Sequence, residues 1–314
     1  MMEFNHDELS SPGWLNEEFF QHVLCEYERD PAVRLVGTCQ LRPGTKAGDH
    51  FASVMYRTTF RYQTGGVEKS INLIMKIKPV AEGMKKELLD DEDFFGKEIR
   101  MYTRVLPEMA RLMGSIGEEY KYPNLIFASK TPHTIIILED VSPQGWTMKG
   151  LLKSFEDLQP TIDAIAKFHA ASIVMQANRI VETMFVDYQM CSWSSQVVDL
   201  FYLTYMIPEQ SVKSSHRDAI IHRYYGKFSS VLRRLNYGGK IPSLTELHAE
   251  MLRNGELELF HYIVFSAFRY TDLSKVDSEA FFLGRIENPA LQLEEFKATI
   301  RTELPRFLYW GIIE

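Results

Sequence analysis

The spacing of apolar and polar residues along the chain changes twice, and each change predicts a different kind of structure. Residues 15–23 carry an apolar side chain at every fourth position, which predicts an amphipathic helix with Asn16 as its N-cap. The pattern then alternates and becomes rich in β-branched and aromatic residues over three segments, 33–41, 50–62 and 68–78. These segments predict antiparallel strands, the last two joined by a turn at Gly65-Gly66.

Helical spacing returns from Asp91, where apolar residues recur until Pro107, and predicts a helix that ends at this proline. Residues 122–141 predict two more strands around the turn at Thr131-Pro132. Beyond Gly145 the spacing is helical over four segments, 154–175, 195–236, 244–268 and 291–309. The pattern therefore predicts an α+β fold: a five-stranded antiparallel sheet with one inserted helix, followed by a mostly helical part.

This pattern also suggests where the domains begin and end. We expect an N-terminal tail and helix over residues 1–30, a sheet-containing N-terminal lobe over 31–142, and a helical C-terminal lobe over 143–314. The chain has 314 residues, of which 45% are hydrophobic, so it can bury a substantial core.

Charge and cysteine content exclude several classes of protein. The net charge is −7 and the basic residues are scattered, which argues against a nucleic-acid partner. The three cysteines, Cys25, Cys39 and Cys191, have neither disulfide nor zinc-site spacing. The N-terminus is polar and acidic, unlike a signal peptide, and no apolar stretch reaches the length of a membrane span. We expect a cytoplasmic monomer without a membrane partner.

A lysine and a glutamate give the first indication of chemistry. Alternation along residues 68–78 places Lys76 and Lys78 on one face, and the simplest interpretation is that both are solvated. Glu98, however, borders the apolar stripe of its predicted helix, so its carboxylate faces the sheet and requires a cation. A strand lysine paired with a helix glutamate is how kinase-type sites hold a lysine for the phosphates of ATP.

Two loops could bind the remainder of a nucleotide. Gly44, Gly48 and Ser53 lie in or beside a loop between two predicted strands, whose amides could cover phosphates or could simply form a turn. After the fifth strand, "ILEDVSPQGW" resembles a hinge, and backbone groups near Glu139 and Val141 could bind a nucleotide base. Taken alone, this stretch is also compatible with an ordinary acidic loop.

Asp187 is the candidate metal ligand. It closes the apolar run of "TMFVDYQM", an arrangement by which a strand delivers a carboxylate to the rim of a pocket. The alternative is an aspartate that caps a turn at the end of a strand.

The order of these segments is more specific than any one of them. "IMKIKP", "FFGKEIRMYTRVLP", "IIILEDV", "IAKFHAAS" and "FVDYQMCSWSSQVVDLFYL" together resemble the ecdysteroid-kinase-like (CHK kinase-like) family of insects. This family has the choline-kinase and aminoglycoside-phosphotransferase type of two-lobed, protein-kinase-like fold. The resemblance implies an ATP- and Mg²⁺-dependent transferase that moves the γ-phosphoryl group to a small-molecule hydroxyl, in some members a steroid.

The resemblance also implies roles for individual residues. Lys76 matches the phosphate-binding lysine, Glu98 matches its ion-pair partner, and Asp187 matches the magnesium-binding aspartate. Asp199 matches a structural acid of the helical lobe.

One part of the family pattern is missing. The family carries an H-G-D-L-W catalytic loop, followed by an asparagine, between the "FHAAS" helix and the "VDYQ" strand. Here the interval is "IVMQANRIVETMF", which contains no aspartate and only one acid, Glu182. No catalytic residue is therefore identified, because both the general base and the second metal ligand are absent.

The flanks of this interval are intact, which indicates the removal of one contiguous block, with its seam between Ser172 and Phe185. A skipped exon or an incorrect gene prediction would produce such a chain. We expect either an impaired or inactive product of a kinase gene, or a non-catalytic pseudokinase that binds a small molecule.

Two further features resemble catalytic residues but have simpler explanations. His216, Arg217 and Asp218 spell the H-R-D of a protein-kinase loop, but they follow the candidate metal ligand instead of preceding it, and Arg223 stands where the asparagine should be. We interpret them as the start of a surface helix. His169 lies on the apolar face of its predicted helix, so we expect a core histidine whose hydrogen bonds are satisfied.

Overall fold

The computed structural model describes residues 8–44, 53–79, 93–147, 149–177, 194–272, 275–276, 280–281 and 285–314. The chain divides into two compact units. The first is built mainly from residues up to Thr147, and the second from residues 107–120 together with most of the later chain. The predicted domain boundary at residues 142 and 143 stays a prediction.

The first unit contains an antiparallel sheet, as predicted, and one short strand, β2 (Arg42–Pro43), joins the five that were expected. Its six strands among the described residues are β1 (Arg34–Val36), β2, β3 (Val54–Thr64), β4 (Val67–Ile77), β5 (Leu125–Ser129) and β6 (Ile135–Glu139). They lie in the order β1-β3-β4-β6-β5, and β2 pairs with β3. The predicted strand over 33–41 is shorter in the structure, because Gly37 adopts a φ of 90° directly after β1.

The β3–β4 hairpin sets the register of the sheet. Its two-residue turn is Gly65-Gly66, and both glycines have positive φ, 55° and 78°, as a tight hairpin requires. Thr64 therefore pairs with Val67, and further along the hairpin Met55 lies opposite Lys76.

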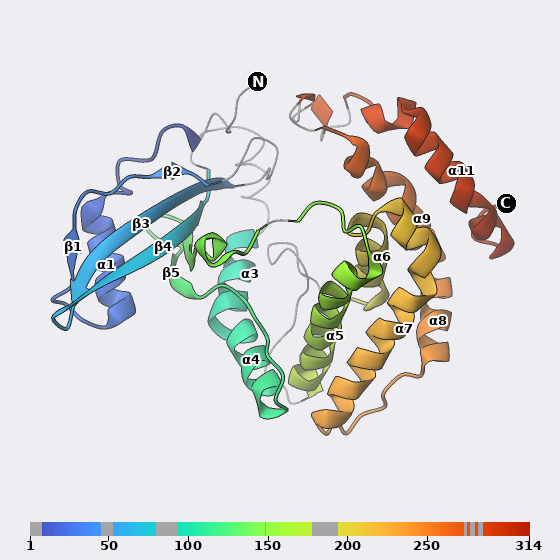
Figure 1. Ribbon diagram of the computed structural model, residues 1–314, viewed down its shortest axis with the longest axis horizontal. Helices are drawn as coiled ribbons and strands as arrows, with labels where there is room; N and C mark the ends of the chain where they lie inside the picture. Colours follow the sequence, from blue (N-terminus) through green and yellow to red (C-terminus); the bar gives the residue numbers. More distant parts are fainter. Residues whose placement is uncertain are drawn as a thin grey trace. The chain divides into compact units, whose positions relative to one another are not determined.

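A helix packs on each face of this sheet (Figure 1). Helix α1 (Glu17–Glu28) begins as predicted, since the Asn16 side chain accepts a hydrogen bond from the Phe19 N–H at 3.1 Å. Its apolar face covers one side of the sheet. Helix α3 (Phe94–Arg100) packs Phe94 and Phe95 against Ile136 on the opposite side.

The prediction that Pro107 ends the helix is wrong. After α3 the chain forms a π-helical turn (Met101–Val105) and continues as α4 (Leu106–Ser115). In the π turn the Leu106 N–H bonds to the Met101 carbonyl, five residues back. This change in the ladder directly before Pro107 accommodates a residue that has no N–H and would otherwise clash with a carbonyl four residues earlier.

The second unit is helical. Its main helices are α5 (Phe155–Ala177), α6 (Val197–Met206), α7 (Gln210–Arg234), α8 (Leu244–Arg253), α9 (Gly255–Phe260) and α11 (Glu294–Tyr309). A π turn (His261–Phe265) and two short 3₁₀ segments (Ser266–Tyr270 and Pro289–Gln292) lie between α9 and α11. Helices α5 and α7 run side by side (Figure 1). The predicted continuous helix over 195–236 is interrupted at Pro208, which cannot donate to a helical ladder.

Glu118 connects three parts of this unit. Its carboxylate accepts from Lys167 of α5 at 2.9 Å, from Lys227 of α7 at 2.9 Å, and from Arg234 near the end of α7. The hydrogen bonds from Lys167 and Lys227, with that from Arg234, lower the pKa of Glu118 to about 2. The ionised carboxylate is therefore favoured in the folded protein.

Glu118 should make the helical unit sensitive to acid. Because the folded-state pKa lies below the unfolded value, its contribution is complete above about pH 4.5 and is lost as the pH falls towards 2. We expect Glu118→Gln to lower stability by about 1–2 kcal/mol at pH 7 and by much less at pH 3. Thermal melts at both pH values check this. The same substitution at Glu287, which is exposed and lies outside any helix, should change stability by less than about 0.5 kcal/mol, and an equal loss at both pH values would contradict the assignment.

Candidate functional site

Lys76 and Glu98 form an ion pair on the α3 face of the sheet. The Lys76 Nζ lies 2.6 Å from the Glu98 Oε2, and the two side chains are only 13% and 10% exposed. Helix α3 presents the glutamate there because Phe94 and Phe95 anchor it to Ile136. The structure thus brings together the two residues that strand alternation and helix spacing singled out.

The register of the sheet shows which residues lie beside Lys76. Lys76 lies between Met55 and Ile136, and the next row on the same face is Arg57, Ile74 and Leu138. Ile74 lies about 7 Å along the strand from Lys76, because each residue advances about 3.3 Å. A charged position is therefore followed by an apolar one in the direction of residues 139–141.

One backbone N–H donor in residues 139–141, at the end of β6, is available to a ligand. Glu139 is engaged, since its carboxylate accepts from the Asn124 amide at 2.7 Å and from the Gln144 amide at 2.6 Å. The Val141 N–H donates to no acceptor in the part of the chain that the structure describes. A backbone donor of this kind could bind an acceptor atom of a nucleotide base.

The loop residues are only partly within the described chain. Ser53 is buried directly before β3, and Gly44 follows β2. The Gly44 N–H donates to the Met55 carbonyl at 2.8 Å, and a Cβ at this position would lie 2.9 Å from the Met55 carbonyl carbon. Packing against β3 alone therefore requires glycine at position 44. Gly48 and the predicted metal ligand Asp187 lie outside the described residues.

His169 is a core histidine with both ring nitrogens satisfied, as expected. Its Nδ1 lies 2.6 Å from the Tyr224 hydroxyl and its Nε2 lies 2.9 Å from the Asp199 Oδ2. Tyr224 also bonds to Gln196 at 3.0 Å, and burial raises its pKa well above the usual value. The network joins α5, α6 and α7, so Asp199 has a structural contact. Sequence reasoning did not identify Tyr224, whose only signal is its place on the apolar face of α7.

The H-R-D sequence is not a helix start, which corrects that prediction. Helix α7 begins at Gln210, so His216 to Asp218 lie inside it, in a polar stretch between the buried residues Val212 and Ile220. Asp218 is 97% exposed, whereas Arg217 is mostly buried and pairs with Glu258 at 2.6 Å. Arg223 pairs with Asp163 at 2.8 Å. None of these side chains is arranged as a catalytic loop.

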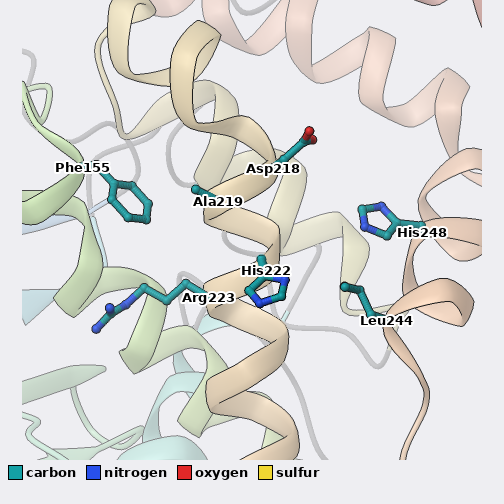
Figure 2. A pocket seen from close by; sticks show the side chains of 7 residues that line it. All are labelled: Phe155, Asp218, Ala219, His222, Arg223, Leu244 and His248. Carbon is teal, nitrogen blue, oxygen red and sulfur yellow. The ribbon is translucent and has the colours of Figure 1, made fainter.

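A hollow of about 750 Å³ lies beside this part of α7 (Figure 2). Its lining comes from the start of α5, from α7 and from α8: Phe155, Asp218, Ala219, His222, Arg223, Leu244 and His248. Figure 2 shows Phe155 and Arg223 on one side of α7 and His248 on the other. The hollow is open to solvent, its guanidinium is already paired, and it contains no residue predicted to bind a nucleotide.

The described residues contain no group of three or more His, Cys, Asp or Glu side chains placed to hold a metal ion. Among the helices that the structure describes, none combines the length and the apolarity needed to span a membrane.

The sequence profile of the ecdysteroid kinase-like family (EcKL) matches the chain in two segments, residues 47–180 and 176–237. Together they cover more than half of the chain, including the Lys76–Glu98 pair, the 139–141 segment and Asp187. A comparison with curated proteins finds no match. The two compact units, one built on an antiparallel sheet and one helical, agree with the kinase-like architecture of this family. The chain belongs to the ecdysteroid kinase-like family.

Proposed function

We propose that this protein binds Mg–ATP on the sheet face that carries Lys76, and that its transfer of phosphate to a small-molecule hydroxyl is strongly impaired. Membership of the family supports a kinase-like, small-molecule phosphotransferase origin. The single observation that carries the nucleotide proposal is the buried Lys76–Glu98 pair.

The residues on this face fit a nucleotide. Lys76, held by Glu98, would contact the phosphates, while Ile74 and Leu138 offer an apolar surface to the base and the Val141 N–H offers it a donor. Asp187 would hold Mg²⁺, as the family resemblance implies. ATP supplies the transferable phosphoryl group, and the protein's part is to bind and orient it.

The proposed loss of turnover follows from the interval between Ser172 and Phe185. It contains no aspartate that could act as general base. The two family matches meet at residues 176–180, inside the predicted seam, and leave no unmatched residues between them. An insertion in this chain would leave unmatched residues between the two matches, so the arrangement supports the loss of a block of residues from this chain. Loss of a positioned general base costs about 10²–10⁴ in rate, and loss of the second metal ligand adds to this.

The second candidate function is a binding protein that has no phosphotransferase activity at all. The same missing loop favours it, and its ligand would be a nucleotide or a small molecule such as a steroid. The two candidates differ in one measurable outcome: an impaired kinase forms a trace of phosphorylated product from labelled ATP, whereas a binding protein forms none.

Calorimetry tests the shared proposal of nucleotide binding. We expect the wild type to release heat with Mg–ATP, and Lys76→Met and Asp187→Asn each to weaken binding by about tenfold or more, because each removes one contact to the phosphates or their metal. Lys69→Met is the matched control, since it removes the same charge from the same strand, at a side chain that is 46% exposed.

The proposal fails if the wild type shows no heat with Mg–ATP, or if the Lys76→Met and Asp187→Asn proteins bind as tightly as the Lys69→Met control. Thermal melts of each variant establish that the fold is retained.

A further inference from the structure

Arg57 is an unexpected residue on the sheet face that carries Lys76. It lies on β3 opposite Ile74, one row from Lys76 and next to the apolar position where a base would lie. Its side chain is 32% exposed, which is low for an arginine on the face of a sheet. Because Ile74 is its cross-strand neighbour, Arg57 borders the proposed base position, and about a third of its side chain stays open to solvent.

The guanidinium is held in one orientation from two sides. Its Nε donates to the Gly44 carbonyl at 2.8 Å. Its Nη1 donates to the Asp140 Oδ2 at 2.9 Å, to the Asp140 Oδ1 at 3.1 Å and to the Ser142 hydroxyl at 2.7 Å. Asp140 is itself fixed, because its Oδ1 also accepts from the Ser142 N–H at 3.0 Å. Few degrees of freedom remain to be lost when a ligand binds.

One edge of the group remains available. Among the described residues, none accepts a hydrogen bond from the Arg57 Nη2. The guanidinium therefore offers a ligand two N–H donors and, where solvent reaches it, a planar face. Such a face stacks on aromatic rings, and the larger ring system of a purine gives more contact than a pyrimidine.

We propose that Arg57 is the base-contacting residue of the nucleotide site and that it gives the site a preference for purine over pyrimidine nucleotides, with Asp140 as its positioning residue. This inference rests on the proposed nucleotide binding. A purely structural role, in which Arg57 only joins the Gly44 loop to residues 140–142, predicts no difference between the two classes of base.

Three probes separate the two ends of the ligand: Mg–ATP, Mg–CTP, and Mg–tripolyphosphate, which has no base. We expect the wild type to prefer ATP to CTP by about tenfold. Arg57→Met should bind ATP about tenfold more weakly and abolish the preference, while its affinity for tripolyphosphate stays within about twofold. Arg61→Met is the matched control, because Arg61 lies on the same strand and face but is 64% exposed. It should bind all three probes like the wild type.

Arg57→Lys provides a second test in case Arg57→Met does not fold. Lysine keeps the charge that pairs with Asp140 but lacks the planar face, so this variant should fold and still lose most of the purine preference. An unchanged ATP-to-CTP ratio in either folded variant overturns the inference, as does a parallel loss of ATP and tripolyphosphate. If the wild type binds tripolyphosphate as tightly as ATP, the inference about Arg57 is overturned, but the proposed binding of Mg–ATP is not. A wild type that binds none of the probes overturns the proposed function as well.

Discussion

Glu258→Gln is expected to destabilise the protein by about 3 kcal/mol, because it removes the buried anion that two largely buried guanidinium groups share and leaves only Glu303, at 3.1 Å, to pair with Arg306. Glu258 is 1% exposed, and its carboxylate accepts from Arg217 at 2.6 Å and from Arg306 at 3.0 Å. The hydroxyl of Tyr205 donates to it at 2.6 Å. Burial acts to raise the pKa of Glu258, but the two arginines outweigh it and the pKa is lowered. The side chain is therefore ionised at neutral pH.

Urea unfolding at pH 7 measures this loss. Glu256→Gln is the matched control, since it makes the same change on the same helix, α9, at an exposed position, and its effect should stay within about 0.5 kcal/mol. The double variant Glu258→Gln with Arg217→Met should lose less than the sum of its single changes, because it removes one of the stranded charges as well. Strict additivity would show that Glu258 does not stabilise the unit through Arg217.

Lys213→Met, unlike Glu258→Gln, is expected to stabilise the protein, by about 2–4 kcal/mol at pH 6. Lys213 is 2% exposed on α7, and its Nζ lies 5.0 Å from the centre of the Tyr205 ring and 4.8 Å from that of Tyr262. Burial lowers its pKa to about 7. Of the charged groups around it, Glu303 opposes this shift, whereas Arg269 and Arg306 reinforce it. Methionine fills a similar volume without a charge to desolvate.

Because the pKa of Lys213 is lowered in the folded protein, the stabilising effect of Lys213→Met should depend on pH. Between about pH 7 and 10 the unfolded chain keeps a proton on Lys213 that the folded chain has released, so the stability of the wild type rises with pH through this window. The advantage of Lys213→Met should therefore shrink by about 1.4 kcal/mol per pH unit above pH 7. Unfolding at pH 6, 7.5 and 9 measures it. The control Lys153→Met removes a lysine that is 80% exposed and should show no such trend. An advantage that stays constant with pH would refute the proposed titration of Lys213.

The antiparallel sheet and the helical second unit could be predicted because each depends on local periodicity. The alternation along β3 and β4, together with two adjacent glycines, determines a hairpin within one stretch of sequence. The continuation of the helix past Pro107 could not be predicted in this way, because the π turn that permits it has no recognisable pattern of its own.

Of the two ion pairs at the candidate site, one could be predicted from the sequence and the other could not. Lys76 and Glu98 were identified because each stood out within its own element, and the family order then suggested that they meet. Arg57 and Asp140 are 83 residues apart in the sequence, and neither interrupts the pattern of its segment. Their contact depends on how β3, β4 and β6 are ordered in the sheet, which periodicity does not reveal.

The close packing of Gly44 against β3 has a consequence for the evolution of this protein. Every amino-acid replacement at this position adds a Cβ that meets the Met55 Cβ and carbonyl carbon at 2.8 and 2.9 Å, so selection for folding alone would eliminate such mutations. A lineage that stopped using ATP would retain this glycine for as long as it retained the sheet. The presence of Gly44 therefore cannot distinguish active enzymes of this lineage from descendants that have lost activity.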